Sequence, residues 1–72
     1  MQETIVIDSE FITLGQLIKL ANILESGGMV KGFIKEEGAI VNGEREHRRG
    51  RKLYPGDTVE VDGVGAFVVA RN

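Results

Sequence analysis

A chain of 72 residues without cysteine has room for one domain and cannot form a disulfide framework or a thiolate metal site. No stretch approaches the roughly 18 apolar residues of a membrane span, which excludes a transmembrane helix. The formal net charge is −2, but residues 45–52 hold five bases and one acid, a local charge of +4, so the other residues sum to −6. Because binding follows the local potential, the weak overall acidity does not exclude an anionic partner.

The N-terminal segment MQETIVIDSE contains acids and lacks the basic start and apolar middle of a signal peptide, so we expect a cytoplasmic protein. A chain this short buries about 60% of the surface that its unfolded form exposes, which leaves little room for a deep pocket beside a core. The size therefore favours a binding module over an enzyme.

The first predicted elements are a strand over residues 3–7 and a helix that begins near Leu14. The strand is rich in β-branched residues, and Thr13 followed three positions later by Gln16 is a capping-box pattern. Apolar residues then recur at helical spacing. The predicted buried face consists of Leu14, Leu17, Ile18, Ala21 and Leu24.

A short second helix is predicted over residues 28–37, after the break at SGG. Ser26 is a candidate N-cap for this helix, and Gly38 is placed at the C′ position where helices commonly stop. Lys31 and Lys35 are four residues apart and share a face that points away from the core. The predicted buried face consists of Met29, Val30, Phe33 and Ile34.

Strands and tight turns fill the rest of the chain. Asn42-Gly43 predicts a two-residue hairpin turn between a strand ending at Val41 and a returning strand that reaches residue 47. Residues 54–57, YPGD, fit a type II turn, and two further strands follow, the last ending near Arg71. The predicted fold class is α+β in the order β-α-α-β-β-β-β, with two adjacent helices packed on a small antiparallel sheet.

The basic stretch lies between a strand and a turn, so most of its side chains are expected to be exposed. Its cations are Arg45, Arg48, Arg49, Arg51 and Lys52. Beside Lys31 and Lys35, and with Lys19 as an extension, they predict a surface that follows phosphates. The alternative is that the arginines pair with the chain's own acids. The nearby acids in the sequence are Glu36, Glu37, Glu44, Glu46 and Asp57.

The order of these motifs resembles the RNA-binding domain first described in ribosomal small-subunit protein four, hereafter the S-four domain. The matching segments are LGQLIKLANILESGGMVKGFIKEEGAIVNGE and GRKLYPGDTVEV, within residues 13–61. The resemblance covers about two-thirds of the chain, and the short length makes the chain most similar to the stand-alone bacterial members of the YaaA type. Many family members begin the second helix with Ser-Arg-Ser, whereas this chain has ESGGMVKG there.

The resemblance implies a single S-four-like domain over residues 1–72 that binds structured RNA without catalysis. Ribosomal RNA is the first expectation and transfer RNA the second, with the ribosome or an assembly intermediate as the larger partner. By their match to the family's basic positions, the residues that would contact phosphates are Lys31, Lys35, Arg48, Arg49, Arg51 and Lys52, to which the charge cluster adds Arg45. The weakly basic start of the second helix shifts this role toward residues 48–52.

Two other classes of protein remain as alternatives. A protein-interaction module of the β-grasp type would share the Asn-Gly hairpin, but the chain ends Ala70-Arg71-Asn72 where sulfur carriers need Gly-Gly. Ile23, apolar on the polar side of the first helix, would then contribute to a partner surface. An enzyme is disfavoured because the acids form no motif for metal or acid–base chemistry, and no cofactor is expected. Of the two rings that could stack on bases, Tyr54 is interpreted as a packing residue and His47 as a strand residue with a local partner.

Overall fold

The computed structural model describes residues 2–21, 23 and 27–72. Two helices and a mixed set of strands confirm the α+β class. The elements are β1 (Gln2–Ile7), β2 (Ile12–Thr13), α1 (Leu14–Leu20), α2 (Gly27–Glu36), β3 (Ala39–Val41), β4 (Glu44–Glu46), β5 (Lys52–Leu53), β6 (Thr58–Val61) and β7 (Gly65–Arg71). No helix among these residues is long and apolar enough to cross a bilayer.

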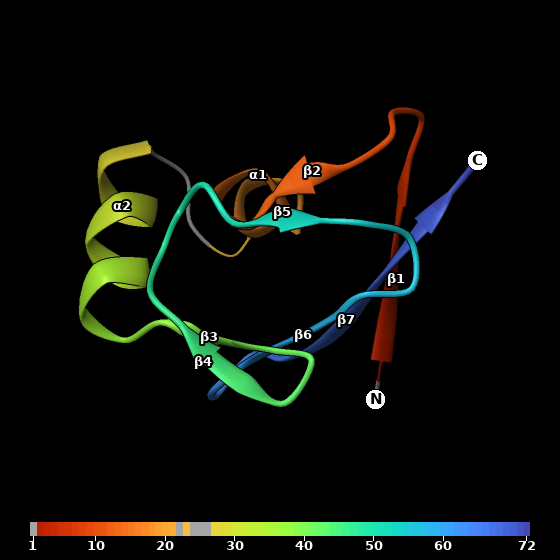
Figure 1. The fold of residues 1–72 in the computed structure, drawn as a ribbon. Coiled ribbons are helices and arrows are strands. Elements are labelled where there is room, and N and C mark those ends of the chain that lie inside the picture. The colour runs from red at the N-terminus through yellow and green to blue at the C-terminus, as the bar shows by residue number, and fades with distance from the viewer. Residues whose placement is uncertain (1, 22, 24–26) are drawn as a thin grey trace.

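The main sheet has five strands in the order β1-β7-β6-β3-β4. The pairs β3–β4, β3–β6 and β6–β7 are antiparallel, as expected for the predicted antiparallel sheet. The expectation of a purely antiparallel sheet is wrong at β1, which pairs in parallel with β7 in the register Ile5↔Val69. Almost the whole chain separates these two strands, so no hairpin turn determines their relative direction. The sheet is therefore mixed, and its two terminal strands lie side by side (Figure 1).

A second sheet of two short strands joins the start of α1 to the basic stretch. β2 and β5 are antiparallel, with Ile12 opposite Leu53 and Thr13 opposite Lys52. Strands of two residues are too short to leave a periodic pattern, which is why they were not predicted. In Figure 1 this pair lies next to α1, apart from the larger sheet, and the connection from β4 rises to it past α2. The pair positions the basic stretch against the helices.

The capping box predicted at the start of α1 is confirmed. The Gln16 backbone N–H donates to Thr13 Oγ1 at 3.2 Å, and the Thr13 N–H donates to Gln16 Oε1 at 2.9 Å. The helix ends at Leu20 with Ala21 as its C-cap, earlier than the apolar spacing suggested. Leu24 and Ser26 lie outside the described residues. Ile23 lies after the end of α1, is half-buried and packs against the core, so its predicted place on the polar side of that helix is wrong.

The second helix matches its predicted position within one residue at each end. Val30 and Ile34 are buried and Phe33 is partly buried, but Met29 is 54% exposed, so its predicted place in the core is wrong. Val30 and Ile34 are four residues apart and face the core directly, with Phe33 packed against it, while Met29 lies at the edge of that stripe. Gly38 follows the helix with φ +75°, and a Cβ at this position would lie 2.8 Å from the Glu46 carbonyl oxygen. Only glycine combines this left-handed backbone conformation with the absence of a Cβ.

Both predicted turns are present. Asn42 and Gly43 have φ values of 50° and 88°, the left-handed pair that a type I′ hairpin turn requires. In the YPGD turn Gly56 has φ 98°, and the Asp57 N–H donates to the Tyr54 carbonyl at 2.9 Å, as a type II turn requires.

A single cluster of apolar side chains joins the helices to both sheets. Its fully buried members with the largest volumes are Leu14, Leu17, Ile18, Ile34, Leu53, Val30, Val41, Val59 and Val69. Leu53 comes from β5, immediately after the basic stretch, so burial of this side chain holds one end of the stretch to the core.

Candidate nucleic-acid interface

The basic stretch is organised around one acid, Glu46, at the end of β4. Glu46 is only 8% exposed, although it is charged. Its Oε2 accepts hydrogen bonds from the backbone N–H groups of His47 and Arg48, both at 3.1 Å, and from Arg48 Nε at 3.0 Å. Its Oε1 accepts from Arg48 Nη2 at 3.0 Å and from Arg51 Nη1 at 2.9 Å. One carboxylate therefore holds two guanidinium groups and two backbone amides.

These contacts change the ionisation of Glu46. The hydrogen bond from the Arg48 side chain, with further ones from Arg51 and the Arg48 backbone, outweighs desolvation and lowers the pKa of Glu46 from 4.5 to about 2. The same contact raises the pKa of the Arg48 guanidinium. The interpretation that the arginines pair with the chain's own acids is therefore right for Arg48 and Arg51.

The backbone of residues 47–51 is fixed to the start of α1. The N–H groups of Leu14 and Gly15 donate to the carbonyl oxygens of Arg51 and Arg49, at 2.9 and 3.0 Å. These two amides belong to the first turn of the helix, where no carbonyl within the helix can accept them. The connection between β4 and β5 thus accepts hydrogen bonds from these two amides of α1, and the same bonds hold the connection rigid.

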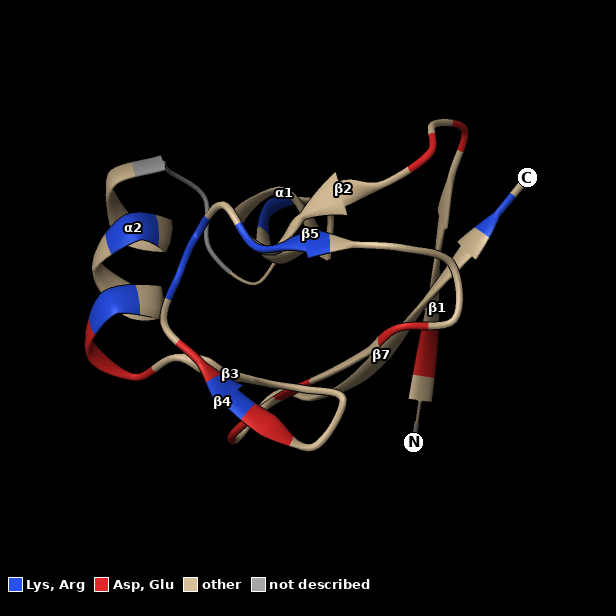
Figure 2. Ribbon diagram, in the orientation of Figure 1, with Lys and Arg blue, Asp and Glu red and all other residues tan. Residues whose placement is uncertain are grey.

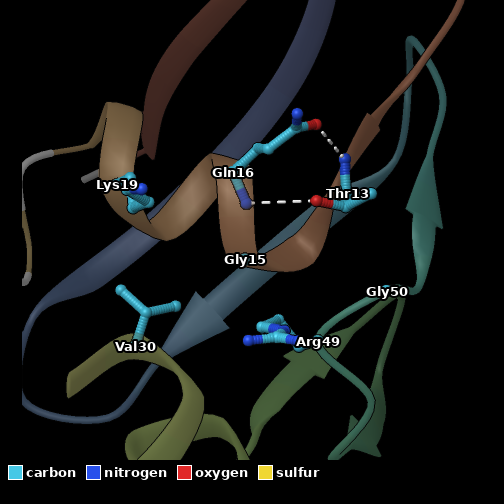
Figure 3. A pocket seen from close by; sticks show the side chains of 7 residues that line it. All are labelled: Thr13, Gly15, Gln16, Lys19, Val30, Arg49 and Gly50. Atoms are coloured by element: carbon cyan, nitrogen blue, oxygen red, sulfur yellow. Dashed lines mark hydrogen bonds between the residues drawn. The ribbon is translucent and has the colours of Figure 1, made fainter. Parts of the chain in front are cut away.

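Arg49 extends from this rigid connection between the two helices. In Figure 3 its side chain lies beside Gly15 of α1 and points toward Val30 of α2, with Lys19 across the same opening. The opening is a shallow pocket of about 320 Å³. It is lined by Thr13, Gly15, Gln16, Lys19, Val30, Arg49 and Gly50. Among the described residues, neither Arg49 nor Lys19 takes part in an ion pair.

Gly15 makes this position of Arg49 possible. A Cβ on residue 15 would lie 2.6 Å from Arg49 Cγ, closer than carbon atoms approach without displacement. No motif in the sequence indicated this requirement, because it depends on contact between segments more than 30 positions apart.

The other predicted cations are distributed over neighbouring elements. Lys31 and Lys35 are exposed on α2. Lys52 is exposed on β5, where its Nζ lies 4.9 Å from the centroid of the Phe11 ring. Figure 2 shows lysine and arginine positions on α1, α2, the 47–51 connection and β5, whereas most acidic positions lie along the main sheet and its turns. We call Lys19, Lys31, Lys35, Arg48, Arg49 and Lys52 the basic face.

Arg45 lies apart from the basic face. Side chains alternate across a strand, so Arg45 and its neighbour Glu46 on β4 point in opposite directions. Arg45 Nη1 donates to the Glu37 carbonyl at 2.7 Å, and Nη2 lies 3.5 Å from Asp62 Oδ2. Arg45, on β4, is thus separated from the other four bases of the stretch, which follow this strand.

The two rings named from the sequence have different environments. His47 Nδ1 lies 3.1 Å from the Ile34 carbonyl oxygen and 3.2 Å from that of Lys35, so it has the local partner that was expected, at the end of α2. Tyr54 packs against Phe11 but is 47% exposed. Its interpretation as a packing residue is therefore incomplete. No group of three or more potential metal ligands occurs within the part of the chain that the structure describes.

Comparison with known proteins identifies the family. Residues 5–69 match the family model described as the S4 domain. A protein of Bacillus subtilis (strain 168) named "Probable ribosome maturation protein RlbA" is 55% identical over 69 residues, which span 96% of this chain and 97% of that protein. Both matches extend well beyond the motifs quoted above. The chain therefore belongs to the S4 domain family, the S-four family that its motif order resembles.

Proposed function

We propose that residues 1–72 act as one RNA-binding domain that docks on structured RNA in the cytoplasm, without catalysis and without a cofactor. Ribosomal RNA, on the ribosome or on an assembly intermediate, is the first target, ahead of transfer RNA. Membership of the S4 domain family and the name of the Bacillus subtilis relative support this assignment. The observation that carries it is the convergence of Arg49 and Lys19, from separate elements, on one pocket in which neither forms an ion pair with a described residue.

The geometry of the basic face suits a helical RNA. The major groove of A-form RNA is too deep and narrow for side chains, so proteins contact its phosphates and 2′-hydroxyls. The backbone of Arg49 is held by the Gly15 N–H, and the planar guanidinium loses little entropy for each hydrogen bond that it forms with a phosphate. Such contacts follow shape and charge, so sequence specificity is low.

The cations of the site have unequal roles in this proposal. Arg49 and Lys19 bind phosphate directly, and Lys31, Lys35 and Lys52 extend the path along α2 and β5. Arg48 uses Nε and Nη2 on Glu46, but its side chain is 77% exposed and keeps further N–H groups for a phosphate. Arg51 is mainly a support for Glu46, and Arg45 contributes least because it is turned toward Asp62.

The test is the salt dependence of RNA binding by the full chain. We expect Arg49→Gln to weaken binding to a ribosomal RNA helix and to lower the log–log salt slope by about 0.7 to 0.9, the share of one phosphate contact. The matched control is Arg71→Gln, which removes an exposed arginine at the end of β7 and should leave affinity and slope unchanged. In Figure 2 the C-terminal end of β7 lies away from α2. Both variants are checked for folding by circular dichroism. A folded Arg49→Gln variant with the affinity and slope of the wild type would contradict the proposal.

The class of RNA is tested separately. Ultraviolet crosslinking in cells, followed by sequencing of the attached RNA, is expected to enrich ribosomal RNA. Enrichment of transfer RNA would move the assignment to the second target, and recovery of no RNA would overturn it.

A further inference from the structure

Two aromatic rings meet beside the basic face, next to the short β2–β5 sheet. The pairing of Ile12 with Leu53 brings Phe11, before β2, alongside Tyr54, after β5. The ring centroids are 5.7 Å apart and the planes are inclined at 47°. Lys52 Nζ lies 4.9 Å from the Phe11 centroid, within the range of a cation–π contact. Phe11 is thus covered by neighbours, while Tyr54 remains 47% exposed.

The exposed tyrosine faces a pocket that is rich in cations. This opening of about 490 Å³ is lined by Arg48, Gly50, Arg51, Lys52, Tyr54 and Asp57. Both oxygens of the one acid, Asp57, are occupied: Oδ1 accepts from Asn42 Nδ2 at 3.2 Å and Oδ2 from the Tyr54 N–H at 2.7 Å. An aromatic face beside two exposed cations, Arg48 and Lys52, matches a nucleotide, whose base stacks on rings and whose phosphate pairs with Lys or Arg.

We propose that this second pocket receives one unpaired nucleotide of the RNA, with its base stacked on Tyr54 and its phosphate held by Lys52 and Arg48. The inference rests on the proposed function and adds a substrate preference to it. An uninterrupted helix keeps its bases stacked inside and cannot offer one to Tyr54, whereas a bulge or loop can. The domain therefore prefers a helix with an unpaired nucleotide at its side.

The neighbouring pocket of Arg49 and Lys19 has a different lining. Its walls contain a threonine, two glycines, a glutamine and a valine, and no aromatic ring. It suits a phosphate of the helix but offers no face for a base. Because the rigid 47–51 connection contributes to both pockets, they take adjacent parts of one RNA.

The experiment compares two RNA helices that differ by one bulged 5-iodouridine. We expect the wild-type chain to bind the bulged helix more tightly, on the order of tenfold, as expected for one stacked base. Irradiation is expected to crosslink the bulged base to Tyr54, mapped by mass spectrometry. Tyr54→Leu, which keeps an apolar contact with Phe11 but has no ring, removes the preference and leaves binding to the unbroken helix unchanged. Tyr54→Phe retains the preference, because stacking does not need the hydroxyl group.

The outcomes separate this inference from the proposed function. Equal binding of both helices by the wild-type chain, or a crosslink that maps away from Tyr54, would overturn the stacking site while RNA binding stands. The same holds if Tyr54→Leu keeps the preference. Arg49→Gln serves as the internal control, since it should weaken binding to both RNA helices equally. Failure of the wild-type chain to bind either helix would overturn both proposals, and these wild-type results do not depend on the folding of any variant.

Discussion

Arg48 and Arg51 differ from Arg49 and Lys52, although all four lie within five consecutive positions. The first two are bound to Glu46 at 2.9 to 3.0 Å and help to fix the connection between β4 and β5. Arg49 instead lies over Gly15 and Lys52 over the Phe11 ring, and neither forms an ion pair with a described residue. Under the proposed function this charge cluster is a scaffold and a binding surface at once, with Arg51 in the scaffold, Arg49 and Lys52 on the surface, and Arg48 in both.

Glu46 determines which of these basic side chains are paired and which are not. Its side chain accepts five hydrogen bonds from residues 47, 48 and 51, so the turn forms around a buried carboxylate. Without that carboxylate, three arginines within four positions would repel one another and the connection would lose its shape. The acid in the middle of the basic stretch is therefore needed to present the remaining cations.

The largest expected effect comes from removing the charge of Glu46. We expect Glu46→Gln to lower the free energy of unfolding by about 2 kcal/mol, because hydrogen bonds to a charged group are lost in a partly desolvated site. Urea unfolding at neutral pH measures this change. Glu44→Gln is the matched control, since Glu44 lies on the same strand but is exposed. If both variants unfolded at the same urea concentration, Glu46 would not be the organising residue.

Acid should break the same contacts in the wild-type chain. The pKa of Glu46 is about 2 in the folded state, against a usual value of 4.5, so the unfolded state binds more protons between these values. Stability from Glu46 is then fully present above about pH 4.5 and is lost as the pH falls toward 2, by about 1 to 3 kcal/mol. Urea unfolding at several acidic pH values measures the loss. In Glu46→Gln this part of the pH dependence should disappear; an identical pH profile would refute the assignment.

Much of the local structure could be predicted from the sequence, because short-range signals determine it. Thr13 and Gln16 cap α1 within a span of four residues, and Asn42-Gly43 needs only its own left-handed dihedral angles. Gly38 ends α2 for the same kind of local reason. The family resemblance rests on these motifs and was confirmed by the match over residues 5–69.

The features that were missed depend on contacts between distant segments. The parallel pairing of β1 with β7 joins the two ends of the chain, and no turn encodes it. The proximity of Phe11 to Tyr54 follows from a two-residue strand pair that leaves no periodic pattern. Which arginines pair with an acid and which do not could not be predicted from the sequence for a similar reason. Several acids were near enough to pair with them, and only the buried position of Glu46 selects it.

Arg51→Gln should mainly lower the stability of the fold, whereas Arg49→Gln should mainly weaken RNA binding. The Arg51 side chain is 34% exposed and bonded to Glu46, so its loss should lower stability by about 1 kcal/mol or less and hardly change the salt slope of RNA binding. Arg49→Gln should leave the urea midpoint near that of the wild type and lower the salt slope of RNA binding. Neutralising Arg48, Arg49 and Arg51 together would mix these effects, so the single variants are the sharper comparison. If Arg51→Gln lowered the slope and Arg49→Gln lowered stability, the roles assigned here would be reversed.

The smallest expected effect tests whether the position of Arg49 matters as well as its charge. In Gly15→Ala the new methyl group would lie 2.6 Å from Arg49 Cγ, so the Arg49 side chain must shift from its present position. We expect RNA affinity to fall about twofold to fivefold with every charge retained, because displaced groups lose the advantage of being pre-positioned. Gly32→Ala on α2 is the control, since no atom lies within 4 Å of its added Cβ. It should raise helix stability by up to about 1 kcal/mol and leave affinity unchanged. If Gly15→Ala bound RNA as well as Gly32→Ala does, the charge of Arg49 would suffice and its fixed position would not contribute to binding.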